Sequence, residues 1–208
     1  MSDSCCQVSI DTHALHTRQR RILVTVLVIN AATFLMMIVA AIMSDSSSLL
    51  SGALDNLGDA LTYALSFAVV GSSTTMKAKV AFFKGVLIFA AAVTVATQIG
   101  WRLFHMETPI FEVMGIAALI NLLANALCLA LLYPHRHNDV NMASVWECSR
   151  NDVFEGFAVI AAALCVWIFS SGWPDILIAF ALLILFLRSA SRVLRSAWRD
   201  LHPVVATS

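Results

Sequence analysis

Four residues with metal-binding side chains form two pairs that share one spacing. Asp55 and Asp59 lie four residues apart, and Cys148 and Asp152 repeat that spacing much later in the chain. On a helix, residues four apart lie on one face about one turn from each other, so both side chains of a pair can reach one cation. Carboxylates and a thiolate are ordinary ligands of divalent cations, and four such groups complete a tetrahedral shell. The spacing therefore predicts a metal site shared by two helices.

Other polar residues lie next to the two pairs in the sequence and are candidates for a second layer around a bound ion. Glu155 follows on the face of Cys148 and Asp152, so it is a candidate second-shell or proton-relay acid, with a solvated mouth position as an equal alternative. Asn56 and Asn151 are candidates for the same second layer. Three other asparagines in apolar stretches are expected to form hydrogen bonds between helices: Asn30, Asn121 and Asn125.

Each ligand assignment competes with a plainer interpretation. A pair of acids can also be hydrogen-bonded within a packed bundle, and a buried cysteine is more often a small hydrophobic residue than a ligand. For Cys148 the argument rests on its spacing from Asp152. Two short groups, Cys5-Cys6 with His13 and His16, and His135 with His137, could deliver metal from the cytoplasm, but ordinary solvated chain ends are the favoured interpretation.

The composition indicates that lipid surrounds most of the chain. Of its 208 residues, 60% are hydrophobic and 12% are charged, and the mean hydropathy is +0.83. The formal net charge of zero gives no electrostatic reason to expect a nucleic-acid partner. The five cysteines lack the paired spacing of a disulfide framework, so we expect free thiols.

Apolar stretches predict an all-α membrane protein with six transmembrane helices. The expected spans are 22–43, a second span from residue 46 that ends at a turn over 71–75, 80–104, 111–133, 142–170 and a last span that begins near residue 173. A charged carboxylate at the centre of a bilayer costs about 3 kcal/mol on insertion scales, so it persists mainly where a cavity, a partner or an ion compensates it. Asp55 and Asp59 fall in the second span, and Cys148 and Asp152 fall in the fifth, which should run antiparallel to it.

Basic residues predict the orientation of these spans. One side would carry eleven of them (Arg18, Arg20, Arg21, Lys77, Lys79, Lys84, Arg136, Arg188, Arg192, Arg195 and Arg199), whereas the other side would carry only Arg102. Both termini should therefore be cytoplasmic, with a tail at 1–20, a transmembrane domain at 21–199 and a short tail at 200–208. No signal peptide is expected, and the cytoplasmic (inner) membrane is the expected location.

These features resemble the cation diffusion facilitator family. The resemblance rests on six spans, the stretch SSSLLSGALDNLGD at 46–59, the stretch KAKVAFFKG at 77–85, and the ligand pair on the fifth span. In that family, Asp-x-x-x-Asp on the second helix and His-x-x-x-Asp on the fifth form the transport site, which corresponds here to Asp55, Asp59, Cys148 and Asp152. The resemblance also implies a homodimer. Two departures are the cysteine in place of histidine, and the expected lack of the cytoplasmic domain that usually follows the sixth helix.

The expected function is export of divalent transition-metal ions in exchange for protons, without enzymatic activity or a resident cofactor. A thiolate beside three carboxylates favours Zn²⁺ and Cd²⁺, with Hg²⁺ and Co²⁺ as further candidates. Movement of helices around a fixed site would expose that site to each side in turn. The alternatives are a membrane metal-binding protein or metalloenzyme that does not transport, and then a channel, which would need acids on more spans than two.

Overall fold

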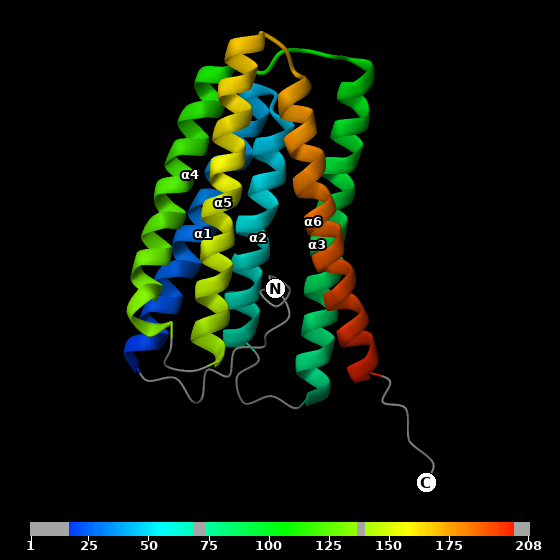
Figure 1. The fold of residues 1–208 in the computed structure, drawn as a ribbon. Coiled ribbons are helices and arrows are strands. Elements are labelled where there is room, and N and C mark those ends of the chain that lie inside the picture. The colour runs from blue at the N-terminus through cyan, green and yellow to red at the C-terminus, as the bar shows by residue number, and fades with distance from the viewer. Residues whose placement is uncertain (1–16, 69–73, 137–139, 202–208) are drawn as a thin grey trace.

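A computed structural model describes residues 17–68, 74–136 and 140–201 of the chain (Figure 1). Its elements are α1 (Thr17–Ser44), α2 (Ser47–Ala68), α3 (Thr74–Phe104), α4 (Phe111–Leu132), the short 3-10 helix η2 (Tyr133–His135), α5 (Val140–Phe169) and α6 (Trp173–Leu201). No strand occurs in the described ranges. The prediction of an all-α fold with six long helices is confirmed.

The helices run up and down in one bundle. α1 begins and α6 ends at the same end of that bundle (Figure 1). Five helices (α1, α3, α4, α5 and α6) contain a segment long and apolar enough to cross a membrane. α2 lies alongside them but is not among the five, since serine, threonine, asparagine and aspartate residues interrupt its apolar positions.

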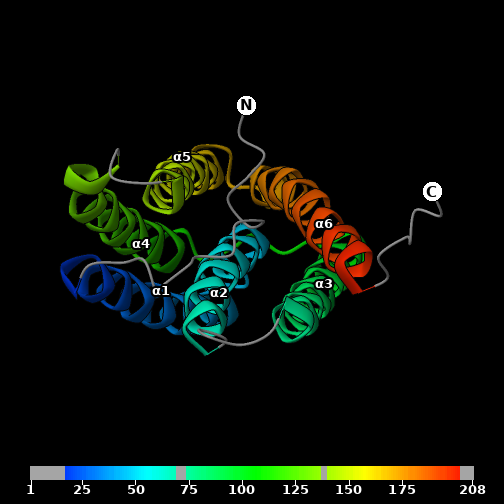
Figure 2. The same ribbon diagram turned by 90° about the horizontal axis from the view of Figure 1, so that it is seen from below.

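The polarity of α2 is explained by its position in the bundle. α2 contacts each of the other five long helices. Seen end-on, it lies between a group made of α1, α4 and α5 and a pair made of α3 and α6 (Figure 2). A helix that is surrounded by protein needs less apolar surface than one that faces lipid. The one long helix without an apolar membrane-spanning segment among the described residues is therefore the one that the others cover.

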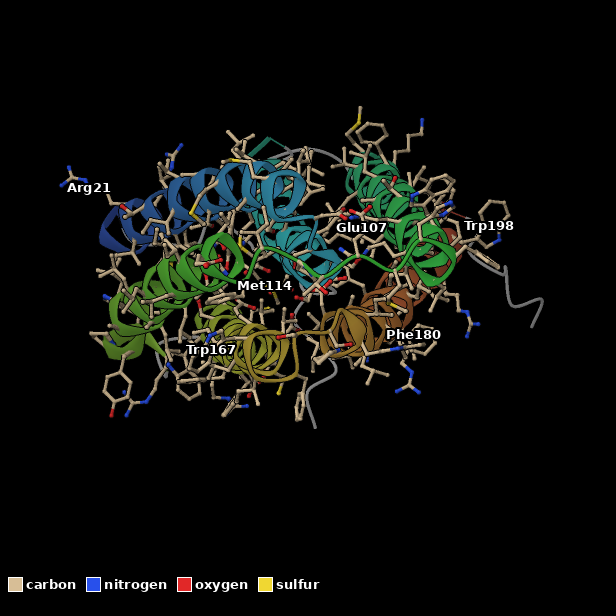
Figure 3. All side chains as sticks on the ribbon, turned by 90° about the horizontal axis from the view of Figure 1, so that it is seen from above. Arg21, Glu107, Met114, Trp167, Phe180 and Trp198 are labelled. Atoms are coloured by element: carbon tan, nitrogen blue, oxygen red, sulfur yellow. The ribbon has the colours of Figure 1, made fainter. Side chains whose placement is uncertain are left out.

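Small residues let the helices on either side of α2 approach closely. Alanines from several helices share one core cluster, including Ala40, Ala53, Ala117 and Ala162. A side chain in place of Gly156 would meet Leu122 Cδ1 at 3.0 Å, so α4 packs tightly on α5 there. Large apolar side chains lie on the outside instead. Figure 3 shows Trp167 and Trp198 pointing away from the bundle, whereas Met114 is fully buried within it.

One predicted helix boundary is only approximate. α2 ends at Ala68 and α3 begins at Thr74, whereas the turn that ends the second span was predicted at 71–75. The third predicted span, 80–104, agrees with the membrane-spanning segment Lys79–Phe104 of α3. Hydropathy does not separate the two helices, since no charged residue occurs between Asp59 and Lys77. Most of the turn predicted there, residues 71–73, lies outside the described residues.

A buried aspartate from α6 caps the first turn of α2. Asp175 is fully buried, and its carboxylate accepts hydrogen bonds from Ser46 Oγ (2.7 Å), the backbone N–H of Ser47 (2.8 Å) and the backbone N–H of Ser48 (3.0 Å). An anion at a helix N-terminus satisfies N–H groups that lack partners within the helix and interacts favourably with the helix dipole. The contact fixes the start of α2 to the start of α6.

Arg102, at the end of α3, completes this cluster. Its side chain is 1% exposed, and Nη1 lies 3.8 Å from Asp175 Oδ2 and 3.7 Å from Asp45 Oδ2. Nη2 donates to the backbone carbonyl of Glu107 at 2.6 Å. Gly172 is required beside it, because an added Cβ would lie 2.6 Å from that same carbonyl oxygen. Arg102 was predicted as a charge at the outer surface, whereas it joins α3 to α6 inside the bundle.

Candidate metal site

The second and fifth helices meet as the spacing predicted. α2 and α5 are antiparallel and in direct contact (Figure 1). The carboxyl groups of Asp55 and Asp59 on α2 each lie within hydrogen-bonding reach of the Asp152 carboxyl on α5. Asp59 and Asp152 are buried, and Asp55 is partly buried. Three of the four predicted ligands therefore come together between two helices; we call them the acid cluster.

A glycine lets α2 pack closely on a neighbouring helix near this contact. An added Cβ at Gly52, one turn before Asp55, would lie 3.1 Å from Met37 on α1 and 3.9 Å from Val159 on α5. An added Cβ at Gly58, directly before Asp59, would lie 3.8 Å from Phe186 of α6, which is an ordinary contact distance. The close approach therefore concerns Gly52, which lets α2 pack tightly on α1 one turn before Asp55.

Cys148 lies in the same buried region. It forms no disulfide with another described residue, and it is buried, with 6% of the residue exposed. Its electrostatic influence reaches the Tyr63 hydroxyl, as does that of Asp59 and Asp152. Within the described ranges, however, no three histidine, cysteine, aspartate or glutamate side chains form a ready-made metal site. The helices bring the predicted residues to one region, and the role of Asp55, Asp59, Cys148 and Asp152 as ligands stays a prediction.

Tyr63 belongs to this region, although the sequence reasoning missed it. It follows Asp59 by four residues, so it continues the face of α2 that carries Asp55 and Asp59. The side chain is 2% exposed and packs with Leu23 and Leu132 in an apolar cluster. The four-residue spacing was the available signal, but an aromatic residue within an apolar span ordinarily indicates core packing.

Glu155 faces the acid cluster from α5. Its carboxyl interacts electrostatically with Asp55, Asp59 and Asp152. One carboxyl oxygen, Oε2, is buried and has no hydrogen-bond partner among the described residues. Glu155 as a whole is partly exposed, so the alternative of a solvated mouth position stays open. A second-shell or proton-relay role for Glu155 stays a prediction.

The asparagines have different partners. Asn56 Nδ2 donates to Asn121 Oδ1 at 2.8 Å, and this buried bond links α2 to α4. The interhelical role predicted for Asn121 is confirmed. Asn30 instead donates to the carbonyl of Val26 in its own helix. Asn151 is partly buried on α5, and no contact described here tests its assignment to the second layer.

Lys84 is the second residue that the sequence reasoning misplaced. It was predicted among the basic residues of the inner surface, but its side chain is only 6% exposed. The ammonium group donates to Thr62 Oγ1 on α2 at 2.6 Å, and its charge acts on Asp59. The structure thus brings a cation from α3 beside the acids of α2.

The predicted delivery groups fall mostly outside the described residues. Cys5, Cys6, His13, His16 and His137 all do. Of the described histidines, His135 is buried in η2, and His105 is exposed and stacks on Trp101 with 3.9 Å between ring centroids. Both histidines lie at or next to the end of a helix, and neither is a sequence neighbour of Asp55, Asp59 or Asp152.

The family of the chain follows from one comparison. A family model described as the cation efflux transmembrane domain matches residues 23–202, a range that runs from the second turn of α1 to the end of α6. The acid cluster, Cys148 and Lys84 all lie inside that match. No curated protein matches the chain closely enough to add a relative. The chain therefore belongs to the cation efflux family, the cation diffusion facilitators, and is a multi-pass membrane protein for the efflux of metal cations.

Proposed function

We propose that this protein exports divalent transition-metal ions, Zn²⁺ and Cd²⁺ above all, in exchange for protons, from a site made of Asp55, Asp59, Cys148 and Asp152. The observation that carries the proposal is the contact of three carboxyl groups between α2 and α5, of which those of Asp59 and Asp152 are buried and that of Asp55 is partly buried. Carboxylates at close range repel one another in a medium of low dielectric constant, so they need either protons or a cation. A cation that enters displaces protons, and protons that return weaken its binding.

Cys148 supports the choice of ions. A thiolate is a softer ligand than the imidazole that the family has at this position, and soft ligands favour Zn²⁺ and Cd²⁺ over Mg²⁺ or Mn²⁺. Hg²⁺ and Co²⁺ are further candidate substrates. The cysteine is buried within the same region as the acids, which is the position that the proposal requires.

The arrangement of helices supports alternating access. α2 carries two of the proposed ligands and contacts both the α1, α4 and α5 group and the α3 and α6 pair. A relative movement of the pair and the group would open the region around α2 to one side and then to the other. α1 begins and α6 ends at the same end of the bundle (Figure 1). We assign that end to the cytoplasmic side of the cytoplasmic membrane.

The test is metal flux coupled to proton movement in proteoliposomes. Asp55→Ala and Asp59→Ala should each abolish Zn²⁺ uptake and the proton counterflow reported by an internal pH-sensitive dye, because each removes a carboxylate from the site. Glu107→Ala is the matched control, since that exposed side chain lies outside the cluster. Normal flux in either aspartate variant would exclude that residue as a ligand.

The same assay separates transport from simple binding. Radiolabelled Zn²⁺ or Cd²⁺ should accumulate inside the vesicles in proportion to time. A membrane metal-binding protein or a metalloenzyme would bind the ion with a fixed stoichiometry and would accumulate none. That outcome would reject the exporter for these ions.

A further inference from the structure

Hydrogen bonds and burial hold the Lys84 side chain in a defined position between α3 and α2. Its ammonium group donates to Thr62 Oγ1 at 2.6 Å, and both side chains are buried. The Thr62 hydroxyl in turn donates to the carbonyl of Gly58 at 2.7 Å. Because the hydroxyl proton points to Gly58, a lone pair of the same oxygen is left to accept from Lys84. Two hydrogen bonds in series therefore fix the ammonium group against α2, one turn beyond Asp59.

That position places the charge beside a proposed ligand. The positive charge of Lys84 acts on Asp59. Asp59 is 5% exposed, and its Oδ2 atom has no hydrogen-bond partner among the described residues. An oxygen left open in this way is available to a cation, so an ion held by Asp59 would feel the ammonium charge that is fixed one turn away, with little screening by water.

We propose that Lys84 is a fixed positive charge that limits the affinity of the acid cluster for divalent cations and so allows the bound ion to leave. This inference rests on the proposed function of the cluster. Three carboxylates and a thiolate would bind a doubly charged ion so tightly that release becomes slow. A cation beside them offsets part of the negative charge without occupying a ligand position, and transport requires binding that is weak enough to be reversed.

The charge of Lys84 should act differently from the sulfur of Cys148. Repulsion between an ammonium group and a metal ion depends on the charge of the ion and not on its softness. Zn²⁺, Cd²⁺ and Co²⁺ all carry two charges. Loss of Lys84 should therefore change their affinities by one common factor, whereas loss of Cys148 should separate Cd²⁺ from Co²⁺.

The experiment compares KM and maximal rate for the full chain in proteoliposomes. Lys84→Gln, which removes the charge, is expected to lower KM for Zn²⁺, Cd²⁺ and Co²⁺ alike by about tenfold and to reduce the maximal rate, because the ion binds more tightly and leaves more slowly. Equilibrium titration of the purified protein with Cd²⁺ should show the same tightening. An unchanged or raised KM in folded Lys84→Gln protein would overturn the proposal.

Three control variants separate charge from structure. Lys79→Gln removes a lysine charge from an exposed position on the same helix and should leave KM unchanged. Lys84→Arg keeps the charge and should keep KM near the wild-type value. Thr62→Val removes the hydrogen bond but keeps the ammonium group, so its effect on KM should be smaller than that of Lys84→Gln. Equal effects of Thr62→Val and Lys84→Gln would overturn the electrostatic role.

The proposal can still be tested if the Lys84→Gln protein does not fold. If Lys84→Gln cannot be purified, Lys84→Arg still decides the matter, since tighter binding in this charge-retaining variant would contradict the proposal. Failure of the proposed function has a different signature. If wild-type protein moves none of the three ions, the transport site itself is wrong, whereas active wild-type protein with an unaltered KM in Lys84→Gln rejects only the role of Lys84.

Discussion

Asp55, Asp59 and Asp152 show what residue spacing can predict in a membrane protein. Acids at bilayer depth are costly, so two of them four residues apart already indicate a common face and a common partner. The contact of both with Asp152 follows from two antiparallel helices. Lys84 could not be placed in the same way. A lysine near the start of a span ordinarily reaches the interface, and only the rotation of α3 against α2 turns it inward.

Cys148 is the residue at which the choice of ion can be tested. We predict that Cys148→Ala lowers Cd²⁺ flux about tenfold more than Co²⁺ flux, because Cd²⁺ gains more from a sulfur ligand. Cys165→Ala, a free thiol later on the same helix, should leave the ratio of the two fluxes unchanged. Equal losses of Cd²⁺ and Co²⁺ flux in Cys148→Ala would refute a role of the sulfur in selectivity.

At the scale of helices, α2 depends on its neighbours for its stability. Apolar stretches predicted all six helices, although α2 has no segment that is apolar enough to count as a membrane span by hydropathy alone. Its N-terminus is satisfied by Asp175, a residue more than a hundred positions later. No local pattern in the sequence links these two segments, because the bond exists only once α6 has packed beside α2.

The Asp175 cap gives a prediction for stability. Asp175→Ala should destabilise the protein by about 3–5 kcal/mol, since it removes one partner of a buried pair and leaves the Arg102 charge and the first N–H groups of α2 without compensation. Thermal unfolding in detergent measures the change. Asp45→Asn, which removes the charge of the half-exposed partner of Arg102 and suits the left-handed backbone at this position (φ 55°), should cost at most about 1 kcal/mol. Similar losses of unfolding free energy in both variants would show that the buried contact of Asp175 contributes no more to stability than the exposed contact of Asp45.

At the scale of the whole molecule, the two ends of the described chain lie at the same end of the bundle (Figure 1). α1 begins and α6 ends at one end of the bundle, as an even number of antiparallel helices requires (Figure 1). Exposed arginines occur toward that end on both helices, for example Arg21 and Arg195, whereas Arg102 near the other end is buried. This asymmetry is the one that the sequence predicted, apart from the burial of Arg102 and Lys84.

The orientation can be measured with reporter fusions. A fluorescent reporter that folds only in the cytoplasm should be active when fused after Ser208, and a reporter that is active only outside the cytoplasm should be active when inserted at Glu107, in the loop between α3 and α4. The reverse pattern of activity would mean that the bundle is inverted and that the proposed direction of transport is wrong.

The most direct measurement of the central claim is X-ray absorption at the zinc edge of the purified, Zn²⁺-loaded protein. We predict a shell with one sulfur at about 2.3 Å and oxygens at about 2.0–2.2 Å, from Cys148 and the three carboxylates. The sulfur should vanish in Cys148→Ala, and the oxygen shell should change in Asp59→Ala. Bound Zn²⁺ whose ligand shell is the same in wild-type, Cys148→Ala and Asp59→Ala protein would contradict the claim that α2 and α5 hold the ion.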